Sequence, residues 1–165
     1  MTATLYALGL AALLGLAAVL PVTLAADIET CDGEQGNDLA DFIKAEVSDC
    51  SEDTPKCPLI RGKNVTLTLT FKTKKDIKEV RHIVHGTVAG VPVPFPLATP
   101  DACQNTGLSC PLSVGEHTYK YALFVKPVYP KLKVQVKWEL KNEENKNIVC
   151  IIIPSELKDA IKDAK

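Results

Sequence analysis

The sequence has no block of basic residues, and its charges are close to balanced. There are 19 Lys and Arg against 20 Asp and Glu in 165 residues, which gives a net charge of −1. Nucleic-acid-binding domains concentrate basic side chains on one surface, so we expect no nucleic-acid partner. The sequence also lacks an internal repeat, a low-complexity tract and a long helical pattern. Its length suits a single domain with a real hydrophobic core.

Motifs of the common enzyme classes are missing as well. The chain contains no G-x-S-x-G, no P-loop and no H-E-x-x-H. Its three histidines are His82, His85 and His117. The first two lie three apart on a strand pattern, so they point to opposite faces and cannot share a metal. We expect one histidine to be partly buried and hydrogen-bonded, and we predict no enzyme activity, no cofactor and no metal site.

One long apolar run exists, and it lies at the N-terminus. The first 26 residues carry no charged side chain, and the run is almost unbroken up to Leu20. Thr23 and Ala25 fit a signal-peptidase site, so we predict a signal peptide over residues 1–25 and a secreted domain. The basic segment that usually begins a signal peptide is missing, and an uncleaved membrane anchor is the alternative.

Six cysteines follow the predicted signal peptide, and none forms a C-x-x-C or zinc-type spacing. An even number in a secreted domain predicts three disulfides, although the count alone leaves many pairings open. Cys50 and Cys57 flank turn-forming residues, as do Cys103 and Cys110. Local bridges there would leave two cysteines near the ends of the domain to pair with each other. These two are Cys31 and Cys150.

Strict alternation of apolar and polar residues dominates the domain, which we place at residues 27–154. The pattern is clearest over 64–72, 118–126 and 131–140. Period two with one apolar face is typical of half-buried antiparallel strands. Weaker candidates are 28–31, 42–47, 79–88 and 148–153. About seven short strands without helices predict an all-β fold, a two-sheet sandwich.

Two local features concern the surface. Asn64 begins the only glycosylation sequon, and it shares the polar face of its strand with Thr66, so a glycan there would face solvent. The alternative is that the sequon is not used. Residues 155–165 form a short C-terminal tail, either a helix capped by Ser155 with Leu157 inward or a frayed end.

Lysines gather in two places, one connection and the polar face of one strand. Near an anionic membrane each such charge contributes about 1 kcal/mol, so a membrane surface is one candidate partner. Plain solubility explains the same residues equally well. The two sets are Lys72, Lys74, Lys75 and Lys78, and Lys131, Lys133, Lys137 and Lys141.

The segment "VPVPFP" at residues 91–96 alternates apolar residues with prolines. Proline has no N–H for a strand ladder, so this segment belongs at a sheet edge or in an extended arm. Apolar side chains on an edge are a hazard for aggregation unless something covers or uses them.

The stretch "HGTVAGVPVPFPLATPDACQNTGLSC", residues 85–110, closely resembles the Niemann-Pick type C2 proteins. These secreted lysosomal cholesterol-transfer proteins share a lipid-recognition domain with the house dust mite group 2 allergens. The match continues through "TYKYALFVKPVYPKLKVQVKWEL" to "CIIIP" and includes all six cysteines in order.

The resemblance implies an immunoglobulin-like sandwich with an apolar pocket between its sheets. It implies the disulfides Cys31–Cys150, Cys50–Cys57 and Cys103–Cys110. It also implies non-enzymatic binding and transfer of a lipid, with sterol as the best-known ligand. The protein would then be a monomer that meets a membrane or a membrane sterol transporter, in the secreted fluid or the lysosomal lumen. The implied ligand-binding residues are Phe95 at the pocket mouth, Val93 and Pro94 beside it, and Val125, Tyr129 and Pro130, with Trp138 on an inward strand face.

Some positions depart from the mammalian cholesterol carriers. The segment between Tyr121 and Val125 is slightly shorter, the stretch from Cys31 to Cys50 is longer, and Val65 stands where those carriers place an aromatic residue. Changed walls would alter the width of the pocket. Two alternatives therefore remain: a carrier of fatty acids or semiochemicals, and an innate-immune module that recognises a lipid.

Overall fold

The computed structural model describes residues 27–31, 38–51 and 54–160. The predicted signal peptide and the last five residues lie outside this part of the chain. No helix among the described residues could serve as a membrane span. The all-β prediction is confirmed, with more strands than the seven or so expected. The strands are β1 (Glu29–Thr30), β2 (Ala40–Val47), β3 (Cys57–Ile60), β4 (Asn64–Thr73), β5 (Arg81–Val88), β6 (Val91–Phe95), β7 (Gly115–Phe124), β8 (Lys133–Lys141) and β9 (Asn147–Lys158).

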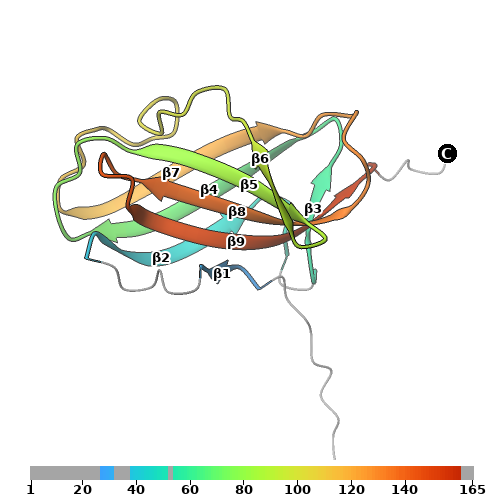
Figure 1. Ribbon diagram of the computed structural model, residues 1–165, viewed down its shortest axis with the longest axis horizontal. Helices are drawn as coiled ribbons and strands as arrows, with labels where there is room; N and C mark the ends of the chain where they lie inside the picture. Colours follow the sequence, from blue (N-terminus) through green and yellow to red (C-terminus); the bar gives the residue numbers. More distant parts are fainter. Residues whose placement is uncertain (1–26, 32–37, 52–53, 161–165) are drawn as a thin grey trace, which may run out of the picture.

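The strands form two sheets that pack face to face (Figure 1). The larger sheet has the order β1-β9-β8-β5-β6, and β3 pairs in parallel with the end of β9. The smaller sheet has the order β2-β4-β7. Every other pairing between strands is antiparallel. Since β8 covers one edge of β9, β1 and β3 share the other.

The core lies between the sheets and follows the alternation in the sequence. On β4, Leu67, Leu69 and Phe71 are buried, and on β7 Tyr119 is buried opposite them. The larger sheet contributes Trp138 and Leu140 from β8, with Ile151 and Ile153 from β9. Side chains at alternate positions point to the same face of a strand, so each sheet presents one continuous apolar surface.

Three disulfides join Cys31 to Cys150, Cys50 to Cys57 and Cys103 to Cys110. These are the pairs that the family resemblance implies. The first bridge links residues 119 apart and joins the chain beside β1 to strand β9. In the chain-entropy account, a bridge that closes so long a loop restricts the unfolded chain more than the two local ones do.

The helical alternative for the C-terminal tail is wrong for residues 155–158. Strand β9 continues through Pro154 to Lys158, because β3 pairs with it in parallel and Leu157 N–H donates to the Leu132 carbonyl oxygen at 2.9 Å. Pro154 falls between the segment of β9 that pairs with β1 and the segment that pairs with β3. The N–H that Pro154 lacks is therefore not needed for a backbone hydrogen bond to β1 or β3.

Candidate functional site

A cavity of about 380 Å3 opens between the sheets at one end of the sandwich. In Figure 1 this is the right-hand end, where β3, β6 and the loop between β7 and β8 meet. Among the described residues that line it, only His85 and Tyr129 have polar side-chain atoms. The lining consists of Leu59, Val84, His85, Gly86, Val88, Val93, Pro94, Phe95, Pro96, Leu123, Val125, Tyr129, Pro130, Leu132, Val134, Val136 and Leu157.

A glycine leaves space in the part of the cavity wall that the larger sheet forms. Gly86 on β5 faces Val134 on β8, and a Cβ atom at residue 86 would lie 3.1 Å from Val134 Cγ2. Any side chain there would crowd Val134. The glycine therefore keeps open the space that the neighbouring valines border.

Two aromatic rings meet at the mouth of the cavity. Phe95 at the end of β6 and Tyr129 in the loop between β7 and β8 have ring centroids 6.0 Å apart and planes at 74°. This edge-to-face contact is a favourable geometry for aromatic rings. Both residues are only partly buried, so the pair borders the interior on one side and solvent on the other.

All six ligand-binding candidates from the sequence lie on this one cavity, although they come from strands and a loop far apart in the chain. Val91, which alternation places beside them, is 61% exposed and falls outside the lining. The sequence reasoning missed several wall residues. Leu123, Val134 and Val136 were visible as apolar positions on alternating strands, whereas Leu59 in β3 gave no signal.

A smaller cavity of about 40 Å3 extends the first one inward. Leu59, Leu123 and Val136 line both spaces. The inner space also reaches Trp138 and Val65. Trp138 therefore faces inward, as the resemblance implies, and Val65 forms part of the wall of the inner space. The remaining lining residues are Val47, Leu67, Tyr121, Ile153 and Ser155.

His82 lies next to this inner end and is 3% exposed. Its Nε2–H donates to the Thr99 carbonyl oxygen at 2.6 Å, which leaves Nδ1 to accept from the Tyr119 hydroxyl at 2.7 Å. The rings of Tyr121 and Trp138 stand edge-on to the imidazole. Burial lowers the pKa of His82, while the Thr99 carbonyl and Asp101 oppose the shift. The sequence predicted one partly buried, hydrogen-bonded histidine; His82 has the predicted hydrogen bonds but is almost completely buried.

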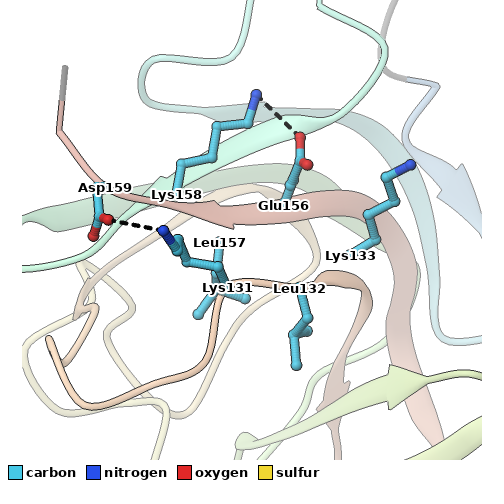
Figure 2. A pocket seen from close by; sticks show the side chains of 7 residues that line it. All are labelled: Lys131, Leu132, Lys133, Glu156, Leu157, Lys158 and Asp159. Carbon is cyan, nitrogen blue, oxygen red and sulfur yellow. Dashed lines mark ion pairs between the residues drawn. The ribbon is translucent and has the colours of Figure 1, made fainter.

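The outer wall of the cavity carries a shallow charged hollow of about 450 Å3 (Figure 2). Leu132 and Leu157 line both the hollow and the cavity, so they form the wall between them. Lys131 pairs with Asp159 at 3.3 Å. A second pair, Lys158 with Glu156, spans 3.0 Å. These two ion pairs neutralise most of the charge around the hollow.

Lysines on the outer face of β8 also have acidic partners. Lys137 and Lys141 each lie 3.2 Å from the buried Glu139 carboxylate, and His85 lies 3.7 Å from it. Burial alone would raise the pKa of Glu139, but Lys141 and Lys137 together hold it below its ordinary value. His85 thus lies beside the Glu139 carboxylate at the edge of the cavity, and Tyr129 is the other described lining residue with a polar side chain.

Comparison with known proteins gives one consistent result. The family model described as the ML domain matches residues 25–157. The ecdysteroid-regulated 16 kDa protein of Manduca sexta is 42% identical over 123 residues, 74% of this chain and 84% of that protein. The NPC intracellular cholesterol transporter 2 homolog a of Drosophila melanogaster is 34% identical over 147 residues, 88% and 97% of the two chains.

A solved structure agrees with these relatives. The crystal structure of a Niemann-Pick type C2 protein from the Japanese carpenter ant superimposes with a TM-score of 0.73 at 32% identity. The superposition covers 80% of this chain and 99% of the ant protein. The chain therefore belongs to the Niemann-Pick type C2 family of ML-domain proteins.

Proposed function

We propose that this protein is a lipid carrier that binds a sterol in the cavity between its sheets and transfers it without catalysis. The observation that carries the proposal is the apolar cavity with Phe95 and Tyr129 at its mouth. Relatives from Drosophila melanogaster and Danio rerio, which are named as cholesterol transporters, support it.

The physical chemistry of the cavity fits such a ligand. Its volume of about 380 Å3 lies within the range of roughly 300–1,000 Å3 that is usual for small-molecule sites. Each Å2 of apolar surface removed from water contributes about 25 cal/mol. A polar group left deep in the apolar interior would cost roughly 2–7 kcal/mol without a hydrogen bond. The ligand therefore keeps its polar end at the mouth, near Tyr129.

We propose that the carrier works outside the cytosol. Residues 1–25 would direct it into the secretory pathway, where three disulfides are stable. Asn64 is exposed at the start of β4, so a glycan on it would leave the cavity free. The carrier would act as a monomer that exchanges its ligand at a membrane or with a membrane sterol transporter, in extracellular fluid or the lysosomal lumen.

A competition experiment tests the ligand class. The full chain is expressed in a eukaryotic secretory host, and the purified protein is loaded with the fluorescent sterol dehydroergosterol. Cholesterol and oleate then compete at neutral and acid pH. The proposal predicts displacement by cholesterol and weak competition by oleate. Preferential displacement by oleate would point to fatty-acid or semiochemical transport, and binding of neither would point to a recognition module.

Phe95→Ala should weaken sterol binding about tenfold, because the variant loses an aromatic contact worth roughly 1.5 kcal/mol or more. Phe124→Ala is the matched control, since Phe124 is 50% exposed and lies outside the described cavity lining. Fluorescence titration gives the Kd, and thermal unfolding checks that both variants fold. Equal affinity in the Phe95 variant and the control would remove Phe95 from the binding site.

A further inference from the structure

The loop between β7 and β8 forms one side of the cavity mouth and carries Tyr129. Its first end is fixed to the turn after β3, since Val125 N–H donates to the Lys63 carbonyl at 2.9 Å and Gly62 N–H donates to the Val125 carbonyl at 2.7 Å. Its other end is fixed where Leu132 accepts the bond from Leu157. Between these anchors, Tyr129 N–H closes a turn onto the Lys126 carbonyl at 3.1 Å.

Arg61 holds the middle of this loop from outside. Its Nη1 donates to the Tyr129 carbonyl oxygen at 3.0 Å, in a partly buried contact between residues 68 apart in the chain. The same guanidinium donates from Nε to the Asp159 carboxylate at 2.8 Å, and Nη2 also contacts that carboxylate. The planar guanidinium therefore joins the main chain of Tyr129 to the end of β9.

Asp159 also holds the loop at a second point. The carboxylate accepts Arg61 through Oδ1 and lies 3.3 Å from Lys131 through Oδ2. Figure 2 shows the Lys131 contact at the edge of the charged hollow, beside the wall made by Leu132 and Leu157. The Arg61 hydrogen bond lowers the pKa of Asp159, with Lys131 acting in the same direction, so the carboxylate stays ionised in mild acid.

An exposed ion pair alone contributes little to stability, so Arg61–Asp159 would be unremarkable by itself. The bond to Tyr129 is different because it fixes the backbone of the residue whose ring meets Phe95 across the mouth. Arginine suits the position because its rigid fork can donate to the carbonyl and the carboxylate together, whereas a lysine ammonium is a point charge on a flexible stem.

We propose that Arg61 is the positioning residue of the cavity mouth: by holding the Tyr129 carbonyl it keeps the Tyr129 ring against Phe95 and sets the rate at which an apolar ligand enters and leaves. This inference rests on the proposed carrier function. It assigns Arg61 a kinetic role, because Arg61 lies outside the cavity lining and bonds to the Tyr129 carbonyl, while Tyr129 itself lines the cavity.

Ligand exchange kinetics test the proposal. Full-chain protein loaded with dehydroergosterol is mixed with an excess of phosphatidylcholine vesicles, and the loss of protein-bound fluorescence is followed by stopped flow. Arg61→Met should raise the association and dissociation rate constants together, each about tenfold, and leave the Kd within about twofold. Arg61→Lys should restore part of the slow exchange. Arg81→Met is the matched control on the exposed start of β5 and should exchange like the wild type.

A ligand-free measurement separates this inference from the carrier function. Hydrogen exchange at the Tyr129 amide of the unloaded protein should quicken in Arg61→Met while the Leu157 amide stays protected. Asp159→Asn keeps the carbonyl bond and should show a smaller change in the same direction. If the wild type binds no sterol, the carrier proposal fails and the amide result still decides the role of Arg61. Unchanged rates and unchanged Tyr129 protection, or a weaker Kd with an unchanged association rate, would overturn the role.

Discussion

His82 is a titratable side chain held in its neutral form inside the sandwich. Its two ring nitrogens bond to the Thr99 carbonyl and the Tyr119 hydroxyl, and the Tyr121 and Trp138 rings surround it. Protonation would place a charge beside the inner end of the cavity, and burial therefore lowers the pKa of His82. The unfolded chain keeps the ordinary pKa near 6.5. Folding is consequently linked to pH through this residue.

The stability of the protein should fall as the pH drops below about 6.5. Below this pH, His82 of the unfolded chain becomes protonated while His82 of the folded protein stays neutral. The free energy of unfolding therefore declines by at most about 1.4 kcal/mol per pH unit, until the pH reaches the pKa of His82 in the folded protein. His82→Gln keeps a polar side chain without this titration and should flatten the dependence between pH 7 and 5. Urea unfolding at a series of pH values measures it.

His117→Gln is the matched control, because His117 is only partly buried and its imidazole bonds to the Ser113 carbonyl near the protein surface. It should keep the wild-type slope. Glu139 acts in a separate window, since its lowered pKa means that its contribution is lost only as the pH falls below about 4.5. A His82→Gln variant with the wild-type slope between pH 7 and 5 would contradict the assignment to His82.

At the scale of elements, β6 shows how an edge strand can be apolar without recruiting another strand. It pairs with β5 through the register Pro94–His85, Val93–Gly86 and Pro92–Thr87. In an antiparallel pair, only every second residue of β6 donates its backbone N–H to β5. Pro92 and Pro94 occupy the other positions, whose backbone nitrogens face away from β5. Val93 remains 51% exposed and still lines the cavity. The prolines thus leave an apolar rim for the ligand and deny N–H donors to a neighbouring molecule.

Replacing both prolines by threonine should make the protein associate through this edge. The double variant Pro92→Thr and Pro94→Thr restores two outward N–H groups beside exposed valines, so dimers should appear in light scattering as concentration rises. A second double variant with lysine at both positions restores the same donors but adds charge, and it should stay monomeric. Monomeric threonine protein at all concentrations would refute the role of the prolines.

The long alternating strands could be predicted from sequence because their pattern is local. β4, β7 and β8 follow from the side-chain period of two alone. β3 could not be predicted, because four residues with a proline carry no period and their pairing partner lies nearly 100 residues away on β9. The same parallel pairing explains why residues 155–158 are strand where a capping serine favoured a helix.

The residues of the candidate site also fall into those that the sequence could predict and those that only the structure shows. The family motif named Phe95 and Tyr129, and the structure adds that their rings touch. The role of Arg61 could not be predicted from the sequence, because Arg61 bonds to the backbone carbonyl of residue 129. Every residue type has this carbonyl, so the amino acid at position 129 does not indicate the contact. Gly86 also needed the structure, since only the approach of Val134 shows why a side chain would not fit.

On the scale of the whole molecule, the sandwich is tightly packed at one end and hollow at the other. Phe71, Tyr119 and Leu140 are fully buried towards the end where β5 begins. The cavity occupies the end where β5 passes into β6. Packing at the first end stabilises the fold, so the second end can leave space unfilled between the same two sheets.

The central claim is that a sterol lies between the two sheets, and photo-crosslinking tests it most directly. The protein is loaded with a sterol that carries a diazirine in its side chain, irradiated, digested and analysed by mass spectrometry. We predict labels on residues of both sheets, among them Leu123 on β7 and Val136 on β8, and their loss when cholesterol competes. Labels confined to the outer surface, such as the hollow around Lys131 and Glu156, and insensitive to cholesterol would contradict the account.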